Sequence, residues 1–298
     1  MNFSTVNWLE LLTFPVLAGG AAAFWYGTQI EPKKYMLESI DITVSGAKAA
    51  TKNKIIKILH ISDLHLCYPE SHKIEFLKII NEDHYDLVLL TGDVFENLSG
   101  LLYSKLLLTQ VPKLGAYAVL GNHDCYNYNM INKTLGRIVR RLRHPKKMRD
   151  VGPIVDALER SNFKVLRNEK VKLSDAGIEI IGIDYPGIDV SDLNNLVNNS
   201  SQDMLKLVLF HMPVNLSTIS NTNVHLAFGG HTHGGQIRIP GVGAIITDSE
   251  LPGSKASGLM TKGNTIFHIS RGLGADPRSN IRIFCPPAAT VVNVTVTG

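Results

Sequence analysis

Two histidines separated by one residue lie in a glycine-rich stretch late in the chain. The stretch, Gly229–Gln236 (GGHTHGGQ), directly follows the apolar run Val224–Phe228 and contains His231 and His233. Neutral imidazoles are favoured ligands for divalent transition metals. Glycine lets the backbone turn tightly and approach an ion or a phosphate closely. A His-x-His pair alone is a weak signal, but here it predicts a metal-binding site in the loop that follows a buried strand.

Four stretches upstream offer matching ligands, each at the end of an apolar run. The step from Asp63 to Asp93 is 30 residues and the step from Asp93 to Asn122 is 29. Each step has the length of one βαβ unit, and the carboxyl ends of parallel strands meet at one edge of their sheet. The sequence therefore predicts that these side chains converge. The candidate metal ligands are Asp63, His65, Asp93, Asn122, His211, His231 and His233.

Seven oxygen and nitrogen donors are too many for one zinc ion and suit two adjacent divalent ions, with Asp93 as the expected bridge. Mixed carboxylate and imidazole donors favour manganese, iron or zinc over magnesium alone. Such a pair of ions holds both the attacking and the leaving oxygen of a displacement at phosphorus. It also lowers the pKa of a bound water, so that hydroxide is available near neutral pH. The expected chemistry is hydrolysis of a phosphoric ester.

Three further residues are candidates for catalysis. His123 lies next to the ligand Asn122 and is followed by Asp124, which suggests an imidazole that is oriented by a carboxylate. Such an imidazole would contact a phosphate oxygen or protonate the leaving group. Arg271, in the stretch Ser270–Gly274 (SRGLG), would supply a positive charge for a phosphate or pyrophosphate.

The elements that must position these residues alternate between strands and helices in the first half of the chain. Alternation of this kind indicates parallel βαβ units. The second half is mainly strands, so that two sheets between layers of helices are expected. The expected strands are 39–44, 55–61, 85–91, 116–120, 165–166, 171–173, 178–183, 205–210, 224–228, 266–270, 281–284 and 290–296, and the expected helices are 71–81, 101–110, 153–161 and 192–199.

An insert at residues 126–149 interrupts this pattern. Its segment from Lys133 to Arg149 contains eight Lys or Arg and no acid, whereas the rest of the chain is net acidic. The apolar residues of the segment recur at helical spacing, which predicts a basic amphipathic helix. Such a helix either lies on anionic lipid or binds an acidic substrate, or it is an ordinary packed helix with a solvated basic face.

The first 30 residues are expected to form a membrane anchor. Leu11–Ile30 is a run of 20 uncharged residues, which is just long enough to span a bilayer. A cleaved signal peptide and a soluble hairpin that packs on the domain are the alternatives. Lys33 and Lys34 are the first basic residues after the run, so the positive-inside rule places the catalytic domain in the cytoplasm. Residues 31–54 are expected to form a linker or an edge strand.

Composition agrees with a packed globular protein in a reducing compartment. The chain has 298 residues, of which 44% are hydrophobic and 19% charged. It contains three cysteines without paired spacing, which argues against a disulfide framework.

Taken in order and spacing, these motifs resemble the calcineurin-like metallophosphoesterase family over about residues 55–298. The resemblance implies a four-layer αββα sandwich that holds two metal ions. It assigns Asp93 to both ions and gives His123 the role that faces the substrate. The glycine-rich loops at 229–236 and 270–274 are similar to those of the bacterial, membrane-associated branch. One metal site is implied to consist of Asp63, His65, Asp93 and His233, and the other of Asp93, Asn122, His211 and His231.

The resemblance also suggests substrates. Enzymes similar to this branch include general phosphodiesterases and a hydrolase of lipid A biosynthesis that splits UDP-diacylglucosamine into UMP and a lipid phosphate. The second substrate fits an anchored, cytoplasm-facing domain with a basic insert. The alternatives are a general phosphodiesterase, a nuclease, or a non-catalytic scaffold of the same fold. The short basic stretch argues against a nuclease and the complete ligand set against a scaffold, so nucleic acid is not expected as a partner.

Overall fold

The computed structural model describes most of the chain. The residues that it describes are 8–45, 47, 54–68, 70–128, 131, 139, 145, 147–198, 204–275 and 280–297.

One six-stranded sheet carries the first three ligand loops. Its strands run in the order β1-β14-β2-β3-β4-β5, and β2, β3, β4 and β5 are parallel to their neighbours within that group. Strand β3 has the sequence LVLLT and is buried along its whole length, as expected for a parallel strand that is covered on both faces. The strands are β1 (Met36–Ser45), β14 (Ala288–Thr297), β2 (Ile55–Ile61), β3 (Leu87–Thr91), β4 (Ala116–Val119) and β5 (Phe163–Val165).

The second six-stranded sheet carries the remaining ligands at the ends of its central strands. Its order is β12-β13-β9-β8-β7-β6, with β13, β9, β8 and β7 parallel to one another and antiparallel strands at both edges. The strands are β12 (Gly258–Lys262), β13 (Thr265–Ile269), β9 (Leu226–Gly229), β8 (Leu205–Leu209), β7 (Ile178–Gly182) and β6 (Glu169–Leu173).

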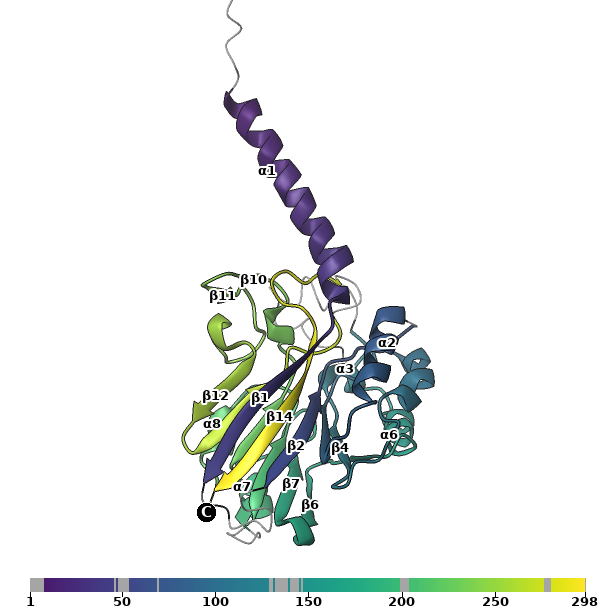
Figure 1. The fold of residues 1–298 in the computed structure, drawn as a ribbon, viewed down its shortest axis with the longest axis vertical. Coiled ribbons are helices and arrows are strands. Elements are labelled where there is room, and N and C mark those ends of the chain that lie inside the picture. The colour runs from purple at the N-terminus through teal and green to yellow at the C-terminus, as the bar shows by residue number, and fades with distance from the viewer. Residues whose placement is uncertain are drawn as a thin grey trace, which may run out of the picture.

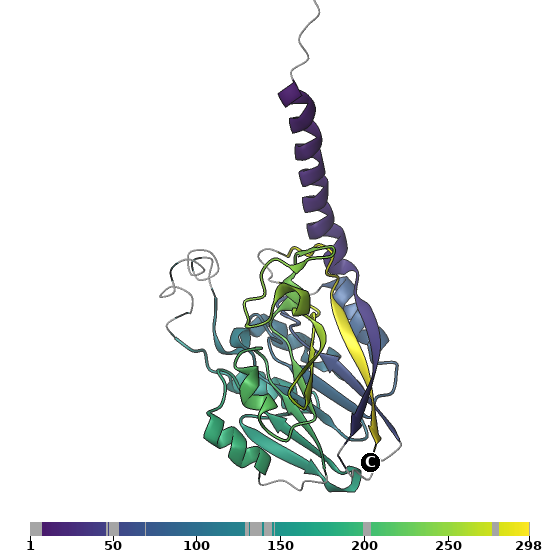
Figure 2. The same ribbon diagram turned by 90° about the vertical axis from the view of Figure 1, so that its left-hand side faces the viewer.

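The two sheets face each other, and helices cover their outer faces (Figures 1 and 2). Between the sheets lies a core that joins Leu89 and Val292 of the first sheet to Leu207 and Phe228 of the second. This arrangement confirms the expected αββα sandwich. The helices α2 (Ser71–Ile80), η3 (Leu98–Leu106, 3-10) and α6 (Gly152–Glu159) cover the first sheet, and α7 (Val190–Asn198) and α8 (Leu216–Ser220) cover the second.

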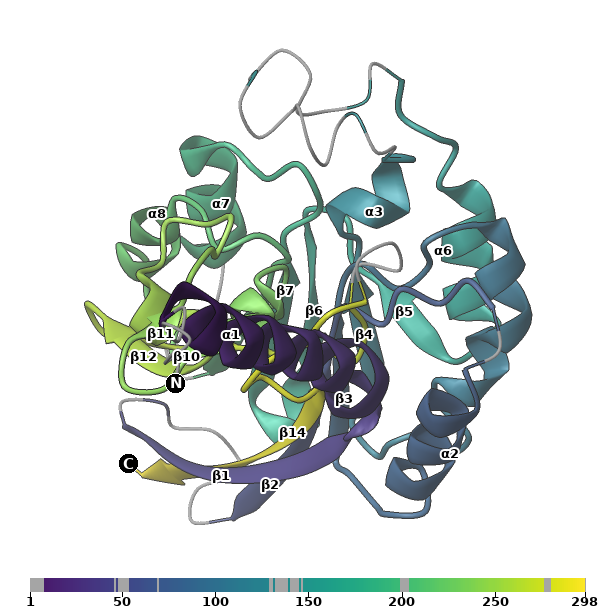
Figure 3. The same ribbon diagram turned by 90° about the horizontal axis from the view of Figure 1, so that it is seen from above.

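The N-terminal apolar run forms helix α1 (Trp8–Trp25), which projects from the body of the protein (Figures 1 and 2) and lies in front of the body in the view from above (Figure 3). Val16 and Leu17 are each 72% exposed. The chain then passes through a short helical turn, Tyr26–Ile30, into the edge strand β1, which pairs with β14. Among the described residues, no helix has the length and apolar character needed to cross a membrane.

The structure differs from the sequence-based expectations in three places. The helix expected at 101–110 is the 3-10 helix η3, which begins at Leu98 and ends at Leu106. The strand expected at 281–284 is wrong, because Ile283 makes only an isolated bridge to Ile237. Between β9 and β12 the chain forms a small hairpin, β10 (Arg238–Ile239) and β11 (Gly243–Ala244), that was not expected. Most of the expected basic helix in the 126–149 insert lies outside the described residues.

Candidate metal centre

The ligand loops leave the carboxyl ends of five strands and are joined by backbone hydrogen bonds. After β2 and β3, the Asp63 N–H donates to the Gly92 carbonyl and the His65 N–H to the Asp93 carbonyl, both at 3.0 Å. A bond between the sheets completes the arrangement, because the His231 N–H donates to Asp63 Oδ1 at 2.9 Å. The loops that follow β2, β3 and β9 therefore form one unit.

Three overlapping groups of donor atoms converge in this unit, and the middle one, His65, Asp93 and His123, shares a residue with each of the other two. Asp63, His65 and His233 form one group, in which the Nε2 atoms of His65 and His233 lie 3.2 Å apart. His233 Nε2 also lies 3.7 Å from Asp63 Oδ1. Asp93, His211 and His231 form the second group.

Asp93 links the two groups. Its Oδ2 lies 3.3 Å from His211 Nε2 and 3.7 Å from His65 Nε2. Burial raises the pKa of Asp93, but the neighbouring histidines, led by His211, together outweigh this effect and hold the pKa well below its usual range. Asn122 belongs to the second group, since its Oδ1 lies 3.1 Å from His211 Nε2. The structure thus brings together all seven ligands expected from the sequence.

Outward hydrogen bonds fix the orientation of three imidazole rings. The Nδ1 atoms of His65, His211 and His233 lie 2.8–3.1 Å from the Glu96 carboxylate, the Thr91 carbonyl and the Gly274 carbonyl, respectively. A proton on each Nδ1 leaves the Nε2 lone pair directed into the site. This is the arrangement that orients histidine ligands in metal proteins.

The backbone is strained at the ligands. Asp63, His65, Asp93, His231 and His233 all have positive φ angles, between 48° and 72°. Non-glycine residues rarely adopt this conformation, and such strain concentrates at functional sites.

Two glycines make room for the ligand carboxylates. A Cβ atom at Gly121 would lie 2.2 Å from Asp93 Oδ1, and one at Gly230 would lie 2.4 Å from Asp63 Oδ2. Any larger residue at either position would displace a carboxylate.

The donor set fits two divalent ions. The side chains converge as two groups that the Asp93 carboxylate joins, and three of the rings are held with their Nε2 lone pairs inward. Mixed imidazole and carboxylate ligands suit manganese, iron or zinc.

His123 lies at the edge of this centre, with its side chain 13% exposed. Its backbone N–H donates to Asp93 Oδ1 at 2.7 Å, and its ring packs against the Tyr128 ring at a centroid distance of 4.7 Å. The carboxylate that contacts the ring is Glu96, whose Oε2 lies 2.8 Å from His123 Nδ1 and 2.9 Å from His65 Nδ1. Burial raises the pKa of Glu96, but hydrogen bonds from the two histidines outweigh this effect and hold it below its usual range.

Asp124 does not orient His123 as the sequence suggested. Its buried carboxylate accepts hydrogen bonds from the backbone N–H groups of Val94, Phe95 and Gly121, at 2.9–3.1 Å. Burial, followed by repulsion from Asp93, raises the pKa of Asp124 to about 6. Asp124 therefore holds the Asp93 loop against the start of the His123 helix (Asn122–Cys125), and it is a positioning residue.

We expect Asp124→Ala to lower the free energy of unfolding by about 3 kcal/mol, because it leaves three buried N–H donors without partners. Urea denaturation monitored by circular dichroism measures the change. The matched control is Asp175→Ala, which removes an exposed carboxylate remote from the site. A loss at Asp124 no larger than at Asp175 would show that Asp124 does not hold these loops together.

Arg271 also differs from its expected role. Its guanidinium donates to the Glu38 carboxylate on β1, so its charge is neutralised at the sheet edge. This contact does not support the predicted phosphate clamp.

A second arginine, Arg282, is fully buried, and no pattern in the sequence indicated a role for it. It donates to the carbonyls of Arg271 and Cys285 at 2.8 and 2.9 Å, and also to that of Gly274. Since the Gly274 carbonyl orients His233, Arg282 supports the metal centre from behind.

Arg149, at the end of the insert, was also missed. Its side chain donates to the backbone carbonyls of Asp124, Phe95 and His123. The end of the insert is therefore attached directly to the loops that carry Glu96 and His123.

Comparison with known proteins agrees with this site. A family model described as calcineurin-like phosphoesterase matches residues 56–235. The metallophosphoesterase YkuE of Bacillus subtilis is 28% identical over 95% of this chain and 95% of its own. The UDP-2,3-diacylglucosamine pyrophosphatase LpxG of Chlamydia muridarum is 26% identical over 97% of this chain and 96% of its own.

Among solved structures, a dimetal phosphatase from Danio rerio has a TM-score of 0.42 at 10% identity and covers 73% of this chain and 88% of its own. The family match covers more than half of the chain and includes all seven converging side chains, from Asp63 to His233. The chain belongs to the calcineurin-like phosphoesterase family and is a metal-dependent hydrolase of phosphoric esters.

Proposed function

We propose that the protein hydrolyses the pyrophosphate bond of UDP-2,3-diacylglucosamine at the cytoplasmic face of a membrane. The observation that carries the proposed hydrolysis is the pair of donor groups that the Asp93 carboxylate joins, with His123 at their edge. The choice of substrate is supported by the similarity to two LpxG proteins, at 26% identity each, which covers 97% and 78% of this chain.

The bound ions, His123 and Glu96 have different roles in the proposed hydrolysis. When bound, the two ions lower the pKa of an attacking water and stabilise negative charge on the phosphoryl oxygens. His123 Nδ1 faces Glu96, which leaves Nε2 for the substrate. A protonated His123 would bind a phosphoryl oxygen or donate its proton to the leaving oxygen. Burial lowers the pKa of His123, and Asp93 and Glu96 oppose this effect, because a carboxylate beside an imidazole stabilises the imidazolium.

Membrane association is supported by helix α1. Apolar side chains of α1 are exposed where it projects from the body, among them Val16, Leu17 and Phe24. Lys33 and Lys34 follow it, and basic residues favour the cytoplasmic, anionic surface of a bilayer. We infer that α1 attaches the protein to the membrane surface and thereby brings the metal centre to lipid-linked substrates.

The substrate is tested by incubating the full-length, manganese-loaded protein with UDP-2,3-diacylglucosamine in mixed micelles and measuring UMP by chromatography. We expect release of UMP and of a lipid phosphate in equal amounts. Absence of UMP would refute this substrate.

Two other substrate classes give different results in the same experiment. Hydrolysis of bis(p-nitrophenyl) phosphate without UMP release would indicate a general phosphodiesterase. Salt-sensitive cleavage of single-stranded DNA would indicate a nuclease. If none of the substrates is hydrolysed although metal is bound, a non-catalytic role would be favoured.

A further inference from the structure

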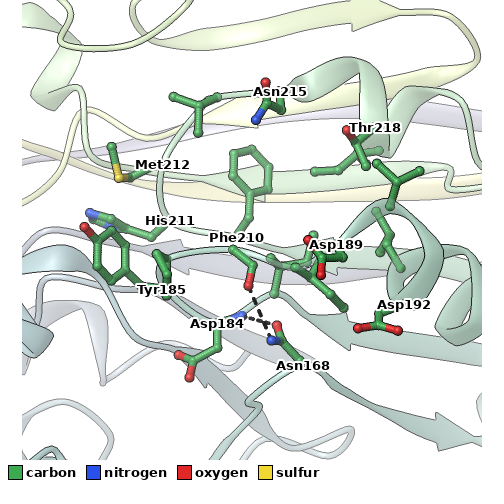
Figure 4. Close-up of a pocket in the computed structure, with 18 residues that line it drawn as sticks. Asn168, Asp184, Tyr185, Asp189, Asp192, Phe210, His211, Met212, Asn215 and Thr218 are labelled. Atoms are coloured by element: carbon green, nitrogen blue, oxygen red, sulfur yellow. Dashed lines mark hydrogen bonds between the residues drawn. The ribbon is translucent and has the colours of Figure 1, made fainter.

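A cavity of about 550 Å³ opens beside the metal centre, between the loop after β7 and helices α7 and α8 (Figure 4). Ligand pockets for small molecules commonly have volumes of about 300–1,000 Å³. Its floor is apolar and buried, with Ile183, Leu193, Phe210 and Ile219 among its lining residues. It is therefore large enough for a ring and provides apolar surface for one.

The cavity is continuous with the metal centre. The metal ligand His211 is one of its lining residues, and Figure 4 shows it at the same end of the cavity as Tyr185. The Tyr185 and Tyr126 rings lie edge-to-face with their centroids 6.1 Å apart, and the Tyr126 and Tyr128 ring centroids are 6.3 Å apart. Since Tyr128 packs against the catalytic candidate His123, these tyrosines form an aromatic wall from the reacting centre to the cavity. Aromatic faces of this kind favour planar or ring-shaped ligands.

The charges of the cavity disfavour an anionic occupant. None of its 18 described lining residues is Lys or Arg. Asp189 and Asp192 lie at its rim, and both are exposed. A second phosphate placed here would be repelled by these carboxylates, whereas hydroxyl or N–H groups of a neutral ligand would find acceptors in them.

Asn168 holds the rim in shape. Its Oδ1 accepts from the Asp184 N–H at 2.9 Å, and its side-chain amide donates to the Gly187 carbonyl at 3.4 Å (Figure 4). Asp184 is in turn paired with Arg167 at 2.7 Å. The loop that forms one wall of the cavity is thus fixed by side-chain contacts.

We propose that this cavity binds a neutral ring with hydroxyl or N–H donors, the sugar or nucleoside that is esterified to the phosphate held at the metal centre. The proposal rests on the proposed hydrolysis at the metal centre and adds the part of the substrate that determines selectivity. In UDP-diacylglucosamine both a nucleoside and a sugar have this chemistry.

The test uses three phosphodiesters that share a p-nitrophenyl leaving group and differ in the second ester group, which is uridin-5′-yl, glucos-1-yl or methyl. The full-length, manganese-loaded protein is assayed for release of p-nitrophenol. We expect kcat/KM for at least one ring ester to exceed that for the methyl ester by about tenfold or more. The uridine and glucose esters distinguish a nucleoside from a sugar as the occupant.

Filling the cavity should remove this selectivity. Thr218→Trp on α8 places an indole in the cavity, and we expect the ratio of ring ester to methyl ester to fall to about one. The matched control Ser217→Trp makes the same change at the adjacent exposed position, which does not line the cavity, and should leave the ratio unchanged. Val190→Trp repeats the test from α7, in case the α8 variant does not fold.

The outcomes separate the two proposals. Equal kcat/KM values for the ring and methyl esters in the unaltered protein, or an unchanged ratio in both filled variants, would overturn the cavity proposal alone. Failure to hydrolyse any of the three esters by a protein that releases UMP from UDP-2,3-diacylglucosamine would also overturn the cavity proposal alone, whereas failure with all four substrates would overturn the proposed function and the cavity proposal with it.

Discussion

Asp93→Asn is expected to lower kcat/KM for phosphodiester hydrolysis by about 10⁴-fold and to reduce the bound metal to at most one ion per chain. The substitution preserves the size of the side chain and its acceptor for the His123 N–H, which lies 2.7 Å from Oδ1. It removes the negative charge from the one carboxylate that links the two donor groups. Elemental analysis after dialysis, together with steady-state kinetics on bis(p-nitrophenyl) phosphate, measures both effects.

The control for this experiment is Asp175→Asn, which removes the same charge from an exposed position. It should retain full activity and metal content. If Asp93→Asn kept two ions and lost less than about tenfold in rate, Asp93 would not be a bridging ligand.

His123→Ala is expected to lower kcat by about 10²–10⁴-fold while the metal content remains that of the unaltered protein. The reason is that His123 lies at the edge of the centre, with its backbone bonded to Asp93 and its ring directed by Glu96. Kinetics and elemental analysis on the same preparation separate loss of proton transfer from loss of metal. An equal fall in metal content and in rate would instead make His123 a ligand.

Glu96→Gln is a second variant that tests the role of His123, because it keeps the size of the Glu96 side chain but removes its charge. A carboxylate favours the imidazolium, so its loss lowers the pKa of His123. His123 is then protonated only at lower pH, and the alkaline limb of the rate profile should move toward lower pH. An unaltered pH profile would show that Glu96 does not act through His123.

The convergence of the candidate metal ligands could be predicted from the sequence because each follows an apolar run that is easy to identify as a strand. The near-equal spacings of Asp63, Asp93 and Asn122 reflect parallel strands β2, β3 and β4, which lie side by side. The carboxylates and histidines that the sequence places at strand ends converge in the structure. Periodicity and strand topology are sufficient for that inference.

The positioning residues could not be predicted in the same way. Adjacency in sequence suggested Asp124 as the partner of His123, but Asp124 follows it in a short helix and its carboxylate turns toward backbone N–H groups. Glu96, 27 residues away in sequence, reaches the ring because the loop after β3 lies beside it. Contacts between loops depend on tertiary packing, which local patterns do not record.

Arg282 and the hairpin β10–β11 show a second limit. Arg282 is fully buried although arginine usually indicates a surface position, because its donors satisfy the carbonyls of a tight loop. The hairpin strands have two residues each, too short for an alternating pattern to be recognised. The edge strand β1 was one of two alternatives for residues 31–54. It pairs in parallel with β14, which lies at the other end of the sequence.

The most direct measurement is anomalous X-ray diffraction from crystals of the full-length protein grown with manganese, collected at the manganese absorption edge. Two adjacent peaks are predicted, one among Asp63, His65 and His233 and the other among Asn122, His211 and His231, with the Asp93 carboxylate between them. No peak in this region, or a single peak at full manganese loading, would contradict the dinuclear centre on which the proposed hydrolysis depends.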